Sequence, residues 1–544
     1  MHQMNFLLLR RRIWLFLLLA SLVAAFIGNL HIARATGMSQ MVPGWHIGGI
    51  IAELSSRHFS NPRDFTALTD VHNTFVAALK DTGVGSVNSA ITNTLKLPRE
   101  NISTSTMTLG ADDKGVVDWV LLSFTLFGEN AESLLKMYFL LLGASCALFA
   151  LTYWRSAAMI LVAIVFLLAH MVQIPITHVN PELQSVLALR FMPVMSMLAC
   201  LHLVMAPFQR SLRCLPLACM LGQAMVISLV FHVRSSTFWQ FGLIILACLI
   251  VGFFVSRNQR MLLPAPQPSK RLHSFFVTLA PAIILALGLA AVVAVQHSRL
   301  AEDYRSGKQI AGHVIWHSFY TGLAFHPVLG PLEGIRVDDV SVMKALGKYL
   351  EQRGRSDEFE DIGGYSLGFS KIQFAPYDLL VKEMLVDTCS KHLQECVSAT
   401  LYYRPLALLE YLAWFHGFIS ELPYPELVDS SALSAFRTMG ISMSDRKSGL
   451  RLFQASVIGI LLLTTFGFML SKQKMNVALI ATLFLAIGAS SPPILIYPMP
   501  HTIGEISIAT SMLILLSLIL CLLTVMQRIF NRRLQEAIKE SSPL

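Results

Sequence analysis

Residues 132–176, ESLLKMYFLLLGASCALFALTYWRSAAMILVAIVFLLAHMVQIPI, contain two apolar runs separated by a short turn at Trp154 and Arg155. The runs cover 132–153 and 156–176, and each is long enough as a helix to cross about 30 Å of hydrocarbon. Inside lipid, every backbone N–H and C=O has to be satisfied within the segment, as a helix does. The stretch therefore predicts a pair of membrane-spanning helices.

The same pattern recurs along the chain. Of its 544 residues, 54% are hydrophobic and 14% are charged, and the mean hydropathy is +0.59. This composition excludes a water-soluble globular enzyme of this size. A sliding hydropathy window predicts an all-α polytopic membrane protein with about ten transmembrane helices. They cover 13–29, 132–153, 156–176, 184–205, 214–232, 237–255, 273–296, 451–470, 475–495 and 505–527.

Basic residues alternate between the two sides of this predicted topology. The loops near 177–183, 233–236 and 496–504 contain a single lysine or arginine, Arg234. By the positive-inside rule, we expect both termini of this multi-pass membrane protein to be cytoplasmic. The net charge of +9 sets orientation, and we expect no nucleic-acid partner. The cytoplasmic loops and termini hold Arg10, Arg11, Arg12, Arg155, Arg210, Arg213, Arg257, Arg260, Lys270, Arg271, Lys472, Lys474, Arg528, Arg532, Arg533 and Lys539.

This topology divides the chain into membrane segments, two extracytoplasmic segments and a tail. The first extracytoplasmic segment ends in an amphipathic stretch, Val120 to Gly128, whose neighbour Trp119 and whose Phe124 and Phe127 suit a membrane interface. The boundaries are 1–29 for the cytoplasmic N-terminus and first helix, 30–131 for the first extracytoplasmic segment, 132–296 for a six-helix bundle, 297–450 for an extracytoplasmic domain, 451–528 for three helices and 529–544 for a cytoplasmic tail.

Three local features have two interpretations each. Ala33-Arg34-Ala35 is typical of a signal-peptide cleavage site, but the preceding apolar run is long for one, and we expect a retained anchor. The apolar stretch Pro405–Ser420 is short and contains Glu410, which favours a buried or surface-lying helix over a span. Cys389 and Cys396 can form a disulfide outside the cytoplasm only if the chain bends between them, because seven residues of straight helix rise about 10.5 Å.

Asp112, Asp113 and Asp118 form the densest acidic cluster that we place near the membrane on the outer face. A carboxylate here can deprotonate an acceptor hydroxyl, or it can bind a divalent cation that neutralises a leaving phosphate. The alternative is a solvated turn, since Asp-Asp-Lys-Gly is ordinary loop chemistry. We predict Asp112 and Asp113 as catalytic and Asp118 as substrate-binding.

Arg190 lies within the span predicted at 184–205. An ionised side chain in hydrocarbon costs several kcal/mol unless it is paired, and a guanidinium fork matches a lipid-linked phosphate. The alternative is snorkelling to the outer headgroups. We predict substrate binding. Four residues near the outer ends of neighbouring spans are suitable partners: His170, His178, Glu182 and Glu505.

His313 and His317 lie four residues apart, on one face if the segment is helical, and Tyr320 follows them. The spacing suits a metal, but no glutamate follows His313, so the zinc-protease signature is missing. We predict that His313, His317 and Tyr320 bind substrate, with a structural role as the alternative. Whether a metal binds stays open, and no cofactor is certain beyond the divalent cation considered above. P-loop, dinucleotide and nucleophile-elbow motifs are absent from the sequence.

Two stretches carry a resemblance. Asp112-Asp113-Lys114-Gly115-Val116-Val117-Asp118 and Trp316-His317-Ser318-Phe319-Tyr320-Thr321-Gly322-Leu323, with Asp338-Asp339 and Tyr377-Asp378, resemble uncharacterised multi-spanning inner-membrane proteins associated with bacterial surface-polysaccharide genes. The overall plan is similar to GT-C glycosyltransferases, whose first outer loop bears an essential acidic residue. That resemblance implies this role for Asp112 or Asp113 and a donor-phosphate clamp at Arg190. The long domain at 297–450 departs from the class by lying between spans seven and eight.

Together with these observations, the resemblance implies a GT-C-like glycosyltransferase of cell-surface glycan assembly in the bacterial inner (plasma) membrane. The expected partners are membrane lipids, a polyprenyl-phosphate-linked sugar, and a glycan or lipid acceptor on the extracytoplasmic face. Two alternatives are a non-catalytic polysaccharide-assembly partner and a lipid or glycan exporter. An exporter should show ionisable residues near the middle of several spans, whereas Arg190 is shallow and nearly alone.

Overall fold

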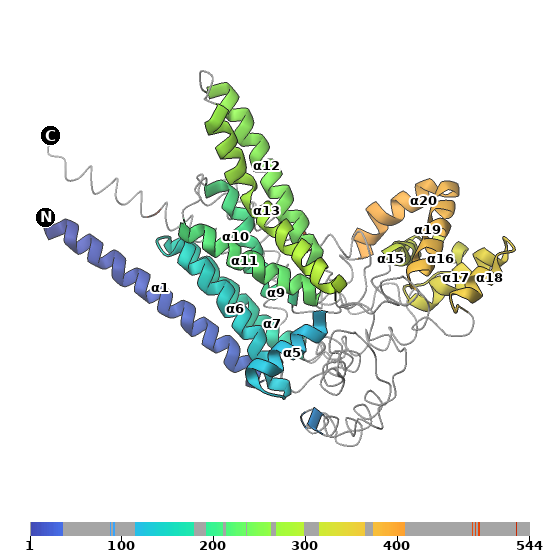
Figure 1. Cartoon of the computed structure of the whole chain (residues 1–544), viewed down its shortest axis with the longest axis horizontal. Helices are drawn as coiled ribbons and strands as arrows, with labels where there is room; N and C mark the ends of the chain where they lie inside the picture. Colours follow the sequence, from blue (N-terminus) through green and yellow to red (C-terminus); the bar gives the residue numbers. More distant parts are fainter. Residues whose placement is uncertain are drawn as a thin grey trace.

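The structure is a computed structural model of the chain. It describes residues 2–35, 115–178, 192–209, 214–234, 237–262, 268–298, 315–364 and 374–407, together with single positions at 88, 91, 92, 481, 485, 488, 489 and 529. Within these residues all of the regular secondary structure is helical, as Figure 1 shows. The predicted all-α class therefore holds for the part of the chain that the structure describes.

The described residues before 299 form a bundle of mostly long apolar helices. Within the described part of the chain, four helices are long and apolar enough to cross a membrane: α1 (His2–Ala35), α6 (Ala131–Tyr153), α11 (Cys214–Val233) and α13 (Pro268–Ser298). The number of ten spans stays a prediction, because most of 184–191 and 451–527 lies outside the described residues. Shorter apolar windows lie within α7 (Ala157–His178) and α12 (Phe238–Leu262). α9 (Met192–Met195) and α10 (Met197–Met205) cover part of the span predicted at 184–205, and the 3-10 turn η5 (Ala206–Gln209) follows it.

The bundle helices pack through apolar side chains. α1 lies along α7, α6 packs on α11, and α13 contacts both α11 and α12 (Figure 1). The fully buried residues include Phe149, Phe166, Leu198 and Ile227, which come from four different helices. Many apolar residues on the outer surfaces are exposed, Phe16, Met225 and Phe253 among them, as expected of helices that face lipid.

A shorter helix, α5 (Gly115–Phe127), lies against one end of α6 and α11. Gly128, at φ 93°, ends α5, and the Asn130 side chain accepts a hydrogen bond from Ser133 N–H at 3.1 Å to begin α6. Trp119 and Phe124 were predicted to suit a membrane interface, but α5 buries both of them against the bundle. Both side chains lie on the face of α5 that packs against the bundle, where α5 contacts α6 and α11.

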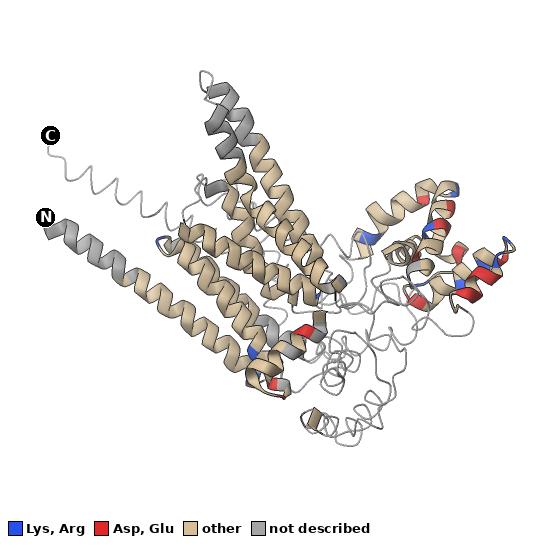
Figure 2. Ribbon diagram, in the orientation of Figure 1, with Lys and Arg blue, Asp and Glu red and all other residues tan. Residues whose placement is uncertain are grey.

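Residues 315–407 form a set of short helices that pack on one another. Their charged side chains gather on α16 to α19 (Figure 2). The core includes Leu323, Leu346, Tyr377 and Val381. The elements are α15 (Ile315–Thr321), η7 (Gly322–Phe325), α16 (Leu329–Glu333), α17 (Asp339–Glu351), α18 (Ser356–Asp361), α19 (Phe374–Lys391), α20 (Leu393–Ser398) and the π-helical turn η9 (Ala399–Tyr403).

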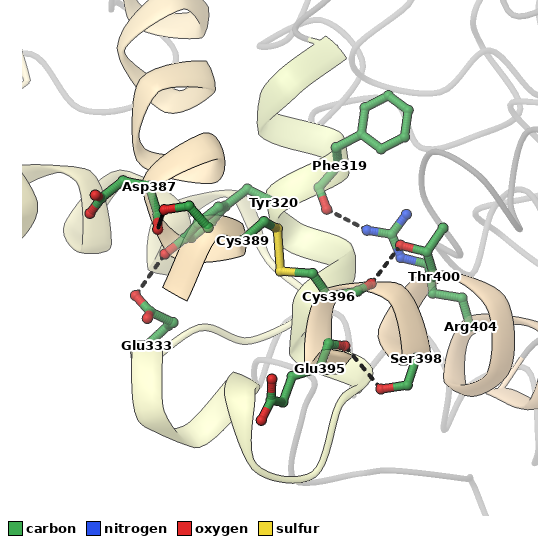
Figure 3. Close-up of a disulfide and its surroundings, with 11 residues drawn as sticks. Phe319, Tyr320, Glu333, Asp387, Cys389, Glu395, Cys396, Ser398, Thr400 and Arg404 are labelled. Atoms are coloured by element: carbon green, nitrogen blue, oxygen red, sulfur yellow. Dashed lines mark hydrogen bonds between the residues drawn. A yellow bond between two sulfur atoms is a disulfide. The ribbon is translucent and has the colours of Figure 1, made fainter. Parts of the chain in front are cut away.

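Cys389 and Cys396 are bridged (Figure 3). α19 ends at Lys391, His392 leaves helical geometry at φ −128° and ψ 50°, and α20 begins at Leu393. This bend brings the two Cα atoms to 5.6 Å, within the range that a disulfide needs. The pairing that the sequence left open is therefore present, for the reason that the helix is broken between the two cysteines.

Candidate functional site

Asp118 is the member of the predicted acidic cluster that the structure describes. It lies in the first turn of α5, and its Oδ2 atom is 2.6 Å from Nε2 of His232 in the last turn of α11. The side chains are 19% and 8% exposed, so the pair is sheltered but the carboxylate is still reachable. Asp112 and Asp113 lie outside the described residues, shortly before α5 begins.

Gly115 explains how α5 reaches α11. A Cβ atom at this position would overlap the backbone carbonyl of His232 and lie 2.8 Å from its Cγ atom. Only glycine lets the first turn of α5 approach this closely. The Lys114-Gly115 sequence, ordinary loop chemistry at first sight, is thus what places Asp118 beside the imidazole.

The short contact has a direct chemical meaning. Since a carboxylate oxygen accepts, His232 Nε2–H donates to Asp118, and a hydrogen bond to an ionised acceptor is about twice as strong as a neutral one. The imidazole fixes the orientation of the carboxylate. A carboxylate held in this way can accept the proton of a hydroxyl group that approaches from the membrane surface.

Trp119 adds an unused donor beside this pair. The side chain is buried, and its indole Nε1 atom makes no hydrogen bond within the structure as described. A buried donor without an acceptor costs about 1–3 kcal/mol, so its persistence is typical of a position that meets a ligand or an ordered water.

Other charged residues collect at the same end of the bundle. Arg34, near the end of α1, pairs with Glu132 in the first turn of α6 at 3.0 Å, and Lys136 is 3.9 Å from the same carboxylate. Figure 2 shows these charges around α5 and the start of α6, in contrast to the uncharged body of the bundle. Both Arg34 and Glu132 are exposed enough that the pair adds little stability.

Arg190 and its suggested partners are only partly described. Arg190, Glu182 and Glu505 lie outside the described residues, and so does the side chain of His178. His170 is buried and faces away from solvent: its Nδ1–H donates to Asn29 Oδ1 at 2.7 Å, and its Nε2 accepts from the Tyr138 hydroxyl at 2.6 Å. This tautomer is assigned from the hydrogen bonds.

His317 lies in a second polar cluster, between α15, α17 and α19. Its Nδ1 is 2.8 Å from the Tyr377 hydroxyl, and its Nε2 is 3.0 Å from Asp339 Oδ1. Burial, followed by the charges of Asp339 and Asp378, raises the pKa of Tyr377. The phenol therefore keeps its proton, and its hydroxyl donates a hydrogen bond to Nδ1. The His317 side chain is 2% exposed and that of Asp339 is 44%, so the carboxylate is the solvent-accessible member of this pair.

The other residues predicted in this segment are placed as follows. The buried Tyr320 hydroxyl donates to Glu333 at 2.9 Å, and burial together with the Glu333 charge raises the pKa of Tyr320. His313 lies outside the described residues. Asp378 holds the start of α15, accepting the N–H groups of Ile315 at 3.1 Å and His317 at 2.9 Å. Substrate binding by His313, His317 and Tyr320 stays a prediction.

Sequence reasoning missed His232. It is a titratable residue at the end of an apolar run, a position where polar side chains are often functional, and this signal could have identified it. Its partner Asp118 is 114 residues away, and no local pattern links the two. Among the described residues, no three His, Cys, Asp or Glu side chains come together as a metal site.

Comparison of the chain with protein-family models, with curated proteins and with solved structures found no match.

Proposed function

We propose that the protein is a membrane-embedded glycosyltransferase of cell-surface glycan assembly. It moves a sugar from a polyprenyl-phosphate carrier to a glycan or lipid acceptor on the outer face of the bacterial inner membrane. The observation that carries the proposal is the Asp118–His232 pair, a partly accessible carboxylate held by an imidazole at the end of an apolar helical bundle. The similarity of the chain's plan to GT-C enzymes adds the reaction class.

The geometry suits a substrate that cannot leave the bilayer. A polyprenyl chain stays in the hydrocarbon, so its phosphate reaches only groups at the end of the bundle. The carboxylate of Asp118, or of the neighbouring Asp112 or Asp113, accepts the proton of the acceptor hydroxyl as its oxygen bonds to the sugar C1 atom. The bond from C1 to the phosphate oxygen breaks, and the polyprenyl phosphate leaves with the electron pair. Arg190 stabilises the charge that develops on the phosphate, and a divalent cation held by the acidic cluster would supply the same stabilisation.

The disulfide supports the proposed side of the membrane. A Cys389–Cys396 bridge persists in an oxidising compartment, and outside the cytoplasm is where the distribution of Lys and Arg places residues 297–450. In this proposal the domain presents the acceptor. The accessible Asp339 carboxylate, held by His317, is the polar group that contacts its hydroxyls.

The test compares surface glycans in cells that lack the protein and carry variants of it. Asp118→Asn and His232→Gln keep size and remove the pair, and each is expected to lower glycan transfer about 100-fold or more. Asp112→Asn and Asp113→Asn test the other two carboxylates of the acidic cluster. Glu132→Gln is the matched control, because it removes a carboxylate from the same end that is paired only with Arg34 and Lys136. Membrane abundance of each variant is measured in parallel.

Three results would count against the transferase. Wild-type glycans in every carboxylate variant, including a triple variant of Asp112, Asp113 and Asp118, would remove the cluster from the reaction. Unchanged glycan composition with reduced total export would favour the exporter. If deletion of the protein abolishes the glycan and every point variant restores it, the result would favour a non-catalytic assembly partner.

A further inference from the structure

The outer face of α20 and η9 is apolar where a solvated helix would be polar. From 393 to 402 the exposed positions are Leu393, Gln394, Val397, Leu401 and Tyr402. Four of them form what we call the apolar ridge: Leu393, Val397, Leu401 and Tyr402, which are 67%, 48%, 69% and 61% exposed. A helix face that meets water usually carries charged and polar side chains instead.

α17, in the same set of helices, has the ordinary pattern. Its exposed positions are Val340, Lys344, Lys348 and Glu351, and three of these four are charged. Figure 2 shows charged residues on α16 to α19, and α20 contains one, Glu395, which is not part of the ridge. The exposed face of α20 and η9 therefore differs from that of α17, although single exposed apolar residues such as Leu332, Leu379 and Val386 lie on other helices of the domain.

The inner face of this helix is fixed, so the ridge cannot turn inward. Cys396 is buried and bridged to Cys389, and Ala399 is fully buried. Arg404, just after η9, is buried and donates to the Phe319 carbonyl, as Figure 3 shows. A Cβ atom on Gly322 would overlap its guanidinium, so the pocket for Arg404 is closely fitted.

The π-helical turn η9 affects how the ridge residues line up along the helix. Leu393, Val397 and Leu401 are spaced by four residues, and in an α-helix of 3.6 residues per turn such a row drifts steadily around the axis. η9 has more residues per turn, and its drift over four residues runs in the opposite direction. Leu401 consequently stays aligned with Leu393 and Val397.

We propose that the apolar ridge rests on the lipid surface of the membrane that holds the bundle. The domain is tethered there: residues 299–314 connect the apolar helix α13 to α15, and sixteen residues reach at most about 55 Å. Lipid is thus the apolar phase always within reach of the ridge. The ridge carries no charge, and Tyr402 has the amphipathic ring that favours the headgroup region.

The sequence beyond the described helix continues the pattern. Residues 408–419 read LLEYLAWFHGFI, and Leu408, Leu412, Phe415 and Ile419 recur at spacings of three and four. Such a pattern with Tyr411 and Trp414 beside it is typical of a helix that lies in the plane of the interface.

The experiment uses the full chain in nanodiscs of phosphatidylethanolamine and phosphatidylglycerol. The photo-crosslinking residue p-benzoylphenylalanine replaces Val397 or Leu401. Glu395, on the other side of the same helix, and Val340, exposed on α17, are the control positions. Lipid adducts, detected by mass spectrometry, are expected to be at least about fivefold more abundant at 397 and 401 than at the controls.

Other occupants of the ridge give different products. Adducts from 397 or 401 to residues 408–450, to a second copy of the chain, or to no molecule above the control level would each overturn the proposal. Retention of the Cys389–Cys396 bridge shows that each variant has folded. A second measurement uses the unsubstituted chain and a diazirine phospholipid. The peptide 393–403 should be labelled and the peptide 340–351 should not, and the reverse would refute the contact.

Discussion

Replacing Cys389 by serine removes the bridge that closes the corner between α19 and α20. Cys389 is half-buried, whereas Cys396 is buried, so this variant breaks the crosslink with the smaller packing change. In the chain-entropy model the stabilisation depends on the number of residues in the closed loop. For a sequence separation of 7, it is about 2.4 kcal/mol at 25 °C. This corresponds to an increase of about 60-fold in the opening of the corner.

The assay is hydrogen exchange of the full chain in nanodiscs, followed by mass spectrometry. Amides of 393–403 should exchange faster in Cys389→Ser by about the same 60-fold factor, while those of α6 should not change. Cys214→Ser is the matched control, because Cys214 is a free and exposed cysteine. Equal exchange at 393–403 in wild type and Cys389→Ser would refute the stabilising role. Thiols at 389 and 396 that react with an alkylating agent in protein isolated from unreduced cells would refute the placement of this domain outside the cytoplasm.

Three further predictions follow from buried contacts. Gly322→Ala has to displace the Arg404 guanidinium and should destabilise residues 315–407 by about 3 kcal/mol or more in hydrogen exchange, whereas Gly242→Ala, with open space around it, should be nearly neutral. Asn29→Leu leaves His170 without its acceptor and should weaken the docking of α1 on α7 by about 2 kcal/mol in thermal unfolding, against no change for the exposed Ser21→Ala. Trp119→Phe keeps an aromatic ring and removes the indole donor, and it should raise the apparent KM for the lipid donor at unchanged thermal stability; an unchanged KM would make Trp119 purely structural.

The sequence predicts the bundle helices well where lipid dictates them. The span predicted at 132–153 corresponds to α6 at Ala131–Tyr153, and that at 214–232 to α11 at Cys214–Val233. In a hydrocarbon environment an apolar run of this length has no other way to satisfy its backbone, so composition decides the structure. The bend at His392 was not predictable, because no periodicity or glycine marks it. It follows from the packing of α20 on α19 and from the disulfide itself.

The sequence indicates which residue types form the candidate site but not which of them contact one another. An acidic cluster beside a membrane span is visible from the sequence, and Asp118 belongs to it. That His232 holds Asp118 depends on the crossing of α5 and α11, which Gly115 permits and which only the folded chain shows. Tyr377 and Asp339 likewise meet at His317 through three helices that are separate in sequence.

The polar groups inside the bundle favour the α5 end as the place of reaction. Three buried groups join the helices: Asn29 and Tyr138 through His170, Ser145 with Gln223, and Ser196 with Gln240, which have hydrogen bonds of 2.6 to 3.0 Å. Each of these residues is at most 1% exposed, so none of the groups is open to a substrate. Lipid offers no hydrogen bonds, and these residues satisfy one another and fix which helices are neighbours. Asp118 and His232 are the same kind of interhelical pair, but they lie at the helix ends and leave the carboxylate 19% exposed. Among the polar pairs that join helices of the described bundle, a buried one can only hold the helices together, whereas this one can also exchange a proton with a bound molecule.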